Sequence, residues 1–467
     1  MNWIENEMKA TSLPDSRLKT RMEKLLSRLS ELPQESIPAN SHGQAGAAAT
    51  YRFFDNHRIL ARDILSGHKQ ATIERIAAQK VVLLVQDTTQ LTYEKDGGAI
   101  FDNGTIRRTE SDKYWLHPVI AFTAQRVNLG SVYHEFWQRE KTNSKQTRKK
   151  REIEDKESMR WLRGYDAACA VQKRCPETCV ISVADRECDI YDFFLAATRK
   201  REENRAEYLI RANANRRLAT ETEDDEKEEA EYLRATMNNA PVLGRYTTEL
   251  SRTPTREART VEIEVRAHMI QFCSPRHRRA TLPAIELYVV QAREIDPPKD
   301  EEGVNWLLLT SLPVENFVQA QTIIGYYKAR WEIELYFRTL KSGSQVEELR
   351  LETDARLENA VVLYMIIAWH LHNTTMLARE TPEANCELVF TREEWRMIYA
   401  LNHRAIPEQA PNLRECVRVL AQVGGFLARK GDGEPGMKTI WRGYVRVMLA
   451  FETIAALNAC RERKICV

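Results

Sequence analysis

The 467-residue sequence lacks the features that mark several classes of protein. It has no apolar run of the roughly eighteen residues that a membrane-spanning helix needs. Its first residues, Met1 to Glu5, lack the basic-then-apolar order of a secretory signal peptide. Nine cysteines are an odd number, and their scatter fits reduced thiols better than a disulfide framework. We therefore expect a cytosolic protein with no membrane partner.

Metal-binding cysteine motifs and repeats are also missing. The spacings of the cysteine cluster at 169, 175, 179 and 188 are not those of a zinc ribbon or finger, and no histidine lies near it in the sequence. We interpret these cysteines as small buried side chains. The chain shows no internal repeat and no long low-complexity tract. What remains is an ordinary globular composition, with 43% hydrophobic and 29% charged residues, and a length that suggests two to four domains.

The net charge of +2 conceals an uneven distribution of charge along the chain. A basic run occupies Lys141 to Arg151, and an acidic run occupies Glu221 to Glu231. A protein that is nearly neutral overall can still present a basic face, so the composition leaves DNA binding open.

Residues 1–78 have a helical pattern. Asp15 is placed to cap a helix that runs to about Leu32. Cations at 17, 21, 24 and 28 form a basic stripe on that helix, separate from its apolar face. The stripe is either a solvated face or a surface that binds phosphates, and the pattern alone favours neither.

The pattern changes to mixed α/β at Lys80. Buried strands are predicted at 81–85 and 179–184, two further strands at about 117–124 and 130–137 with a turn at 128–130, a helix at about 155–174 and another helix from Asp189. This order is that of a ribonuclease-H-like core, although other mixed α/β folds also fit it. Residues 206–311 are rich in predicted strands and suggest an inserted β-sheet. From Val314 the chain is again mostly helical, and its last helix spans about 438–461. We therefore expect an α/β protein with a helical DNA-binding domain at 1–78, a ribonuclease-H-like catalytic domain at 79–375 with the insertion at about 206–311, and a helical C-terminal region at 376–467.

Three carboxylates are candidate metal ligands. Asp87 and Asp185 each come just after a predicted buried strand, where a ligand can reach them, although aspartates that only cap turns are common there. Glu334 lies on a predicted helix in which Tyr327, Arg330, Arg338 and Lys341 share its face. A salt-bridged amphipathic helix would explain the charges, but not why one carboxylate is flanked by three cations and a tyrosine. Such a face suits a phosphate chain that approaches a metal.

Two aspartates and one glutamate are a suitable ligand set for Mg²⁺, which prefers oxygen ligands. A pair of ions about 4 Å apart can activate a nucleophile and stabilise the leaving oxygen of an in-line displacement. Mn²⁺ suits the same ligands. The sequence therefore predicts two Mg²⁺ or Mn²⁺ ions per active site.

The motifs VQDTTQLTY, VADRECDIYDF and YKARWEIELYFRTLK together resemble the DDE transposases of the insertion-sequence-four family, and in particular the Tn5 type. The likeness extends to ATYRFFDN, SDKYWLHPVIA and NWLLLTSLPVE, and so covers nearly the whole chain. The resemblance implies that Asp87, Asp185 and Glu334 hold the metal ions. It also implies that Tyr327, Arg330 and Lys341 hold phosphates around a flipped base near the transposon end.

The resemblance assigns further DNA contacts and an activity. Trp306 corresponds to the family's stacking tryptophan, while Arg211 and Arg350 match DNA-contacting arginines, and Arg17 and Arg21 fall where the family reads its end sequence. The implied enzyme is a cut-and-paste transposase that nicks a transposon end, forms and reopens a hairpin, and joins the 3′ end to target DNA. A homodimer, formed through the C-terminal dimerisation region 376–467, would bridge two double-stranded ends in a synaptic complex, and the protein would be nucleoid-associated in a bacterial cytoplasm. The candidate dimer interface is the last helix, with Trp441, Tyr444, Val447 and Leu449, although these side chains could instead pack on the chain's own core.

Two other functions fit the same residues. A ribonuclease-H-like nuclease that only hydrolyses DNA would use the three carboxylates without needing Trp306 or the C-terminal helix. A non-catalytic DNA-binding protein that inhibits transposition is the other alternative. Products of strand transfer, and their loss in Glu334→Ala, would separate these functions from transposition.

Overall fold

The computed structural model describes residues 3–33, 35–41, 43–94, 100–102, 105–107, 111–139, 157–199, 205–219, 231–250 and 257–464. The basic run at 141–151 lies outside the described residues, as does the acidic run apart from Glu231. The predictions that concern those runs therefore have no structural counterpart below.

Five helices precede the first strand. They are α1 (Trp3–Met8), α2 (Ser16–Glu31), α3 (Ile37–Asn40), α4 (Gln44–Phe54) and α5 (Ala61–Ala77). The predicted cap at the start of α2 is present, because the Asp15 carboxylate accepts the backbone N–H groups of Arg17 at 2.9 Å and Leu18 at 3.1 Å. Met22 and Leu25 are buried on a face of the helix beside its basic stripe.

One mixed sheet forms the centre of the protein. Its strands are β1 (Val81–Gln86), β2 (Thr89–Glu94), β5 (Ser111–Thr123), β6 (Asn128–Gln138), β7 (Cys179–Ala184), β8 (Glu207–Arg211), β9 (Val242–Leu250), β10 (Arg259–Phe272), β11 (Ile285–Glu294) and β12 (Asn305–Thr310). A separate small hairpin consists of β3 (Ile100–Asp102) and β4 (Thr105–Arg107). In the sheet, β6, β5 and β1 are antiparallel neighbours, and β7 and β8 follow in parallel. The order β6-β5-β1-β7-β8 confirms the predicted ribonuclease-H-like α/β core.

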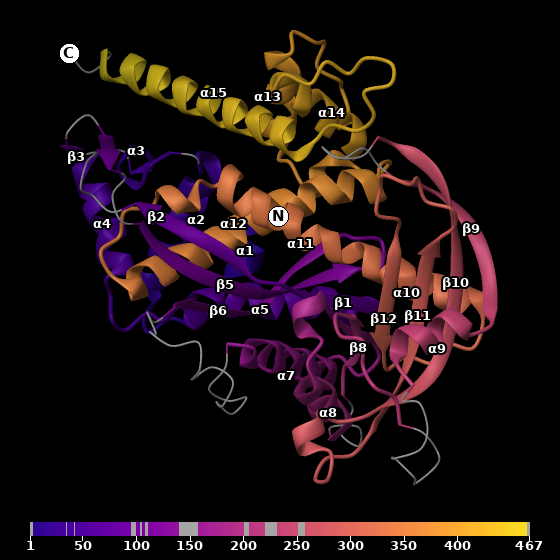
Figure 1. The fold of residues 1–467 in the computed structure, drawn as a ribbon. Helices are drawn as coiled ribbons and strands as arrows, with labels where there is room; N and C mark the ends of the chain where they lie inside the picture. The colour runs from indigo at the N-terminus through magenta and orange to yellow at the C-terminus, as the bar shows by residue number, and fades with distance from the viewer. Residues whose placement is uncertain are drawn as a thin grey trace.

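Two details of the sheet differ from the sequence prediction. The inserted strands do not form a sheet of their own, because β12 pairs with β8 and so extends the core sheet through β11 and β10 to β9 (Figure 1). Strand β8, which the sequence placed in the insertion, belongs to the core, and its outer edge offers unpaired backbone groups that β12 satisfies. The turn between β5 and β6 lies at 124–127 rather than at 128–130, because Arg126 adopts a left-handed conformation (φ 73°) there.

The sheet is covered on both faces by helices. Helices α7 (Met159–Arg174) and α8 (Tyr191–Arg199) pack on one face, where they meet the alternate side chains Val82 and Leu84 of β1. The other face, with Leu83 and Val85, packs against the N-terminal helices and the helices that follow β12. Those helices are α10 (Phe317–Lys328), α11 (Glu332–Arg338) and α12 (Asp354–Glu380). Among the described residues, α12 alone is long and apolar enough to cross a membrane, but 89% of its apolar window is buried, as in the core helix of a folded domain.

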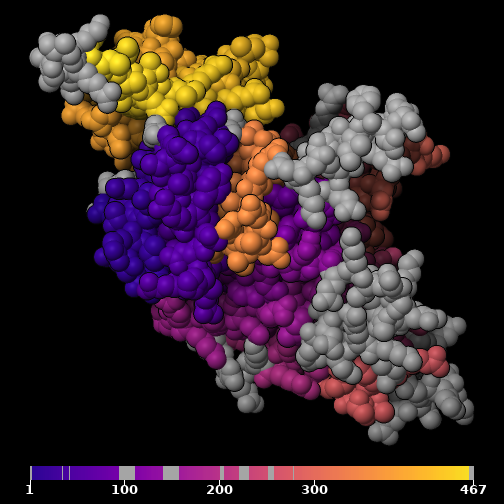
Figure 2. All heavy atoms as spheres, turned by 90° about the vertical axis from the view of Figure 1, so that its left-hand side faces the viewer, coloured from indigo at the N-terminus to yellow at the C-terminus, as the bar shows by residue number. Residues whose placement is uncertain are grey.

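Apart from α9, the remaining helices form a separate C-terminal layer at one end of the protein. They are α13 (Arg392–Leu401), α14 (Leu413–Val423) and α15 (Met437–Lys464), whereas α9 (Leu233–Asn239) packs on β10. In Figure 2 the N-terminal helices and this C-terminal layer form neighbouring parts of one face. Trp441 and Val447 of α15, which the sequence placed at a dimer interface, are buried in the chain's own core. The end of α15 projects from the body (Figure 1) and exposes Leu449, Ile454 and Leu457.

Candidate active site

Asp87 and Asp185 lie at the same edge of the sheet. Strands β1 and β7 are parallel neighbours, and Val85 pairs with Val183 in their register. Each aspartate follows its paired valine by two residues, so the two carboxylates leave adjacent strands at the same level. Continuous apolar, β-branched runs fix both strands in the core, and only the polar residues that follow them reach the surface.

Arg330 joins two of the three predicted ligands. Its guanidinium Nη1 donates to Asp87 Oδ2 at 2.9 Å, and its Nη2 donates to Glu334 Oε1 at 2.6 Å. The side chains of Arg330 and Asp87 are 15% and 19% exposed, and that of Glu334 is 35% exposed. One cation therefore lies between carboxylates that are 247 positions apart in the sequence.

The pKa of Asp87 reflects its burial and the charges around it. Burial raises its pKa to about 6, Arg330 opposes that rise, and the nearby charges of Asp185 and Glu334 add to it. The backbone N–H of Thr88, which donates to Asp87 Oδ1 at 2.7 Å, favours the ionised form. The three carboxylates are thus close enough to influence one another, and Arg330 does not fully offset the effect of burial on the pKa of Asp87.

Asp185 also has a structural role. Its Oδ1 accepts the backbone N–H of Glu187 at 2.8 Å and caps the short 3₁₀ helix Arg186–Cys188. The capping role that the sequence left open is therefore present. It uses one carboxylate oxygen, so Oδ2 has no hydrogen bond among those of the described residues.

The helix that carries Glu334 is not a single α-helix. α10 ends at Lys328, and Ala329–Trp331 form a 3₁₀ turn before α11; a π-helix, Thr339–Gly343, follows α11. Lys341 lies in the π-helix and donates to the Gln90 carbonyl at 2.6 Å. Trp331, the last residue of the 3₁₀ turn, is 52% exposed.

An aromatic and cationic cluster lies beside the carboxylates. Trp306 of β12 and Tyr327 of α10 form an edge-to-face pair with ring centroids 5.4 Å apart. The guanidinium of Arg211, on the paired strand β8, lies 5.8 Å from the Trp306 ring. Burial lowers the pKa of Arg211, and the charge of Arg186 lowers it further. Arg186, which the sequence analysis did not select, thus belongs to the same cluster, and its place directly after Asp185 was the available signal.

The remaining predicted DNA contacts lie outside this cluster. Arg338 is exposed at the end of α11, and Arg350 is exposed in the segment before α12. Arg17, with a side chain that is 91% exposed, and the half-buried Arg21 lie on α2. Trp306, Arg211 and Tyr327 thus form one cluster, whereas Arg338 lies one turn after Glu334 on α11, Arg350 lies between α11 and α12, and Arg17 and Arg21 lie on α2.

Three family models match the chain in order. Residues 1–59 match a transposase DNA-binding model, residues 192–370 match a transposase DDE domain, and residues 366–461 match the Tn5 transposase dimerisation domain. The chain belongs to the Tn5-type DDE transposases. It is a DNA-cleaving and strand-transferring enzyme that depends on divalent metal, binds DNA and forms a dimer.

The matched DDE segment includes Glu334 but begins after Asp87 and Asp185. For those two residues of the transposase, the sheet register places both carboxylates at one edge, and Arg330 connects Asp87 with Glu334. Among the described residues, no three acidic, histidine or cysteine side chains converge closely enough to hold an ion directly. In this DNA-free structure Arg330 is the cation between Asp87 and Glu334.

The chemistry of the three side chains fits a divalent ion. All three supply carboxylate oxygens, the ligands that Mg²⁺ and Mn²⁺ prefer. The raised pKa of Asp87 indicates a place where added positive charge would favour the ionised carboxylate. The transposase thus carries a donor set suited to the metal that its family requires.

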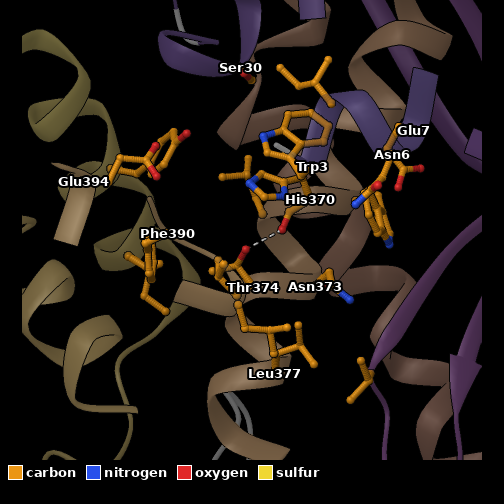
Figure 3. Close-up of a pocket in the computed structure, with 18 of the residues that line it drawn as sticks. Trp3, Asn6, Glu7, Ser30, His370, Asn373, Thr374, Leu377, Phe390 and Glu394 are labelled. Atoms are coloured by element: carbon orange, nitrogen blue, oxygen red, sulfur yellow. Dashed lines mark hydrogen bonds between the residues drawn. The ribbon is translucent and has the colours of Figure 1, made fainter. Parts of the chain in front are cut away.

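A large cavity of the transposase lies elsewhere. It has a volume of about 1140 Å³ and opens between the N-terminal helices, α12 and the C-terminal layer (Figure 3). Its walls include Trp3, Glu7, Ser30, His370, Thr374 and Glu394. None of the predicted site residues lines it. The carboxylates lie instead at the edge of the sheet where β1 and β7 end.

Proposed function

We propose that this enzyme is a cut-and-paste transposase in which Asp87, Asp185 and Glu334 hold the metal ions. The observation that carries the proposal is the contact of Arg330 with both Asp87 and Glu334, beside Asp185 at the same sheet edge. The aromatic and cationic cluster of Trp306, Tyr327 and Arg211 adjoins these carboxylates and supports a DNA strand as the substrate.

We assign two Mg²⁺ or Mn²⁺ ions to the three carboxylates. When bound, such ions would supply Lewis acidity for attack by water or a 3′-hydroxyl and would neutralise charge on the leaving oxygen. The chain's own cations then have the task of holding the phosphates. Arg330 and Lys341 are candidates, together with the neutral hydroxyl of Tyr327, because each is directed toward the carboxylates or toward the strand and loop around them.

The reaction would proceed by successive in-line attacks on phosphodiesters. Water nicks one strand at the transposon end, and the freed 3′-hydroxyl attacks the opposite strand to close a hairpin. A base flipped out of the tight hairpin would stack on Trp306, whose half-buried ring is presented beside Arg211. Hydrolysis reopens the hairpin, and the 3′ end then attacks the target DNA.

The parts of the chain would divide this work. We propose that residues 1–78 bind the transposon end through the cationic face of α2, that 79–375 catalyse, and that 376–467 dimerise. The exposed apolar residues Leu449, Ile454 and Leu457 near the projecting end of α15 support a dimer contact there. Such a dimer would bridge two DNA ends in a synaptic complex, on DNA in the cytoplasm.

A labelled transposon-end fragment with Mg²⁺ tests the proposal. The wild type should give nicked, hairpin and strand-transfer products, and Asp87→Asn, Asp185→Asn and Glu334→Gln should each lose all three while still binding the end. Arg163→Gln is the matched control, because Arg163 pairs with Glu135 on a surface away from the carboxylates. Nicked DNA as the sole wild-type product would support a hydrolytic nuclease, and DNA binding without any metal-dependent product would support an inhibitor.

A further inference from the structure

A buried arginine on α7 contacts the loops after both strands that carry the aspartates. Arg160, in the first turn of α7, has a side chain that is only 8% exposed. Its Nε donates to Thr88 Oγ1 at 2.9 Å, and its Nη2 donates to Glu187 Oε2 at 2.6 Å. Thr88 directly follows Asp87, and Glu187 lies two residues after Asp185. One guanidinium thus links the two loops without touching either aspartate.

The direction of the hydrogen bonds below Thr88 follows from Gln86 and Arg160. Gln86 Oε1 can only accept, so the neutral His117 carries its proton on Nε2 and donates to that oxygen at 3.2 Å. His117 Nδ1 then accepts from the Thr88 hydroxyl, 2.9 Å away, and the same hydroxyl accepts from Arg160, whose guanidinium can only donate. Gln86 completes the chain by donating to Ser182 Oγ at 3.0 Å.

This chain of hydrogen bonds crosses the strands that carry Asp87 and Asp185. Gln86 precedes Asp87 on β1, His117 is on β5, and Ser182 is on β7, three residues before Asp185. All three side chains are fully buried. Burial keeps His117 neutral by lowering its pKa well below the ordinary value, and the charge of Arg160 acts in the same direction. The hydrogen bonds of His117 fit this neutral state, because one ring nitrogen accepts and the other donates.

We propose that Arg160 is a positioning residue that sets the separation of Asp87 and Asp185 for the metal ions. A plain surface salt bridge would not have this effect, since the Glu187 side chain is 64% exposed and such a pair contributes little. The hydrogen bond from Arg160 to Thr88 differs from such a pair, because the Arg160 side chain is buried and Thr88 is hydrogen-bonded in turn to the buried His117. Partners that orient metal ligands typically contribute about 10- to 100-fold to metal affinity. The inference rests on the proposed function, because it takes both aspartates as ligands.

Binding of Mn²⁺ to the DNA-free full-length chain, followed by electron paramagnetic resonance, tests this role without using activity. We expect Arg160→Gln to bind Mn²⁺ at least about tenfold more weakly than the wild type. Arg160→Lys should be intermediate, since lysine keeps the charge but lacks the fork that reaches two partners. Arg163→Gln, on the same helix but paired with Glu135, should bind Mn²⁺ as the wild type does.

The controls separate this inference from the proposed function. Asp185→Asn should lose the Mn²⁺ binding altogether, and a wild type that binds no Mn²⁺ sensitive to Asp185→Asn would overturn both the site and the role of Arg160. If that site is present and Arg160→Gln keeps wild-type affinity, the positioning role alone is wrong. Thermal unfolding in EDTA shows whether each variant is folded. If Arg160→Gln does not fold, Arg160→Lys decides, and wild-type affinity in that variant overturns the inference.

Discussion

Replacement of Glu7 by glutamine should release α1 from the rest of the protein. Glu7 is 2% exposed, and its carboxylate accepts from His68 Nδ1 at 2.5 Å and from Arg75 Nη1 at 2.7 Å. His68 Nε2 accepts the backbone N–H of Ser131 at 2.9 Å, so His68 is neutral and uses its one N–H for Glu7. Glu7 therefore supplies a buried negative charge to a contact that joins α1 to α5.

The size of the effect follows from what glutamine cannot do. Its amide keeps one acceptor oxygen but places an NH₂ group against either the His68 or the Arg75 donor. Removing one partner of a buried ion pair costs about 3–5 kcal/mol. Arg75 is 27% exposed and stacks on Trp369 at 4.3 Å, so water can hydrate part of the released charge. We therefore expect the lower end of that range, about 3 kcal/mol.

Hydrogen exchange measured by mass spectrometry checks this prediction, because it reports opening of α1 without requiring the whole chain to unfold in one step. About 3 kcal/mol corresponds to roughly a 150-fold loss of protection in peptides that cover 3–8. Glu5→Gln is the control, since Glu5 lies on the same helix and is exposed. Equal protection in the two variants would refute the reasoning.

Three further predictions follow from single contacts. Gly164→Ala places a Cβ 2.1 Å from Gln86 Oε1 and should lower the unfolding free energy by about 1–3 kcal/mol, because buried hydrogen bonds are lost. Gly325→Ala has open space at its Cβ and should not lower the unfolding free energy. Equal thermal unfolding of the two variants would contradict this prediction. Burial raises the pKa of Glu7, but the charges and hydrogen bonds of His68 and Arg75 outweigh burial and lower this pKa overall. The stabilising effect of Glu7 is therefore complete above pH 4.5 and is lost as the pH falls through the lowered pKa. Hydrogen-exchange protection of α1 should decline in that pH range in the wild type but not in Glu7→Gln. Trp306→Ala should reduce hairpin formation about tenfold with unchanged Mn²⁺ binding, because stacking of one base contributes about 1–3 kcal/mol; an unchanged hairpin yield would remove Trp306 from base stacking.

The sequence predicted the parts of the site that depend on local pattern. The strands before Asp87 and Asp185 were recognisable because fully buried parallel strands are continuously apolar, and the stripe around Glu334 was recognisable from helical spacing. Strand pairing was less accessible, since alternation does not specify a partner, and the attachment of β12 to β8 was missed for that reason.

The partners of charged side chains were also beyond the sequence. The sequence places Arg160 on a predicted helix but does not predict its contacts with Thr88 and Glu187, because these depend on the fold. The stripe correctly suggested cations near a carboxylate, but spacing along one helix could not reveal that Arg330 also contacts Asp87 on β1. Such contacts depend on tertiary structure, which places residues more than two hundred positions apart within hydrogen-bonding distance.

The contacts of Arg330 lead to an expectation about how metal and DNA binding depend on each other. In the structure the Arg330 guanidinium is shared by Asp87 and Glu334, whereas Lys341 donates to the backbone carbonyl of Gln90. Divalent ions that bind the carboxylates would release Arg330 for a phosphate, so metal should strengthen DNA binding by a coupling of about 5- to 150-fold. Binding of a labelled end, measured with and without Ca²⁺ at constant ionic strength, tests this coupling. Both Arg330→Gln and Lys341→Gln should weaken binding, but only Arg330→Gln should abolish the effect of Ca²⁺. If the coupling persists in Arg330→Gln, the metal acts on DNA binding by another route, and Arg330 serves only to neutralise the carboxylates.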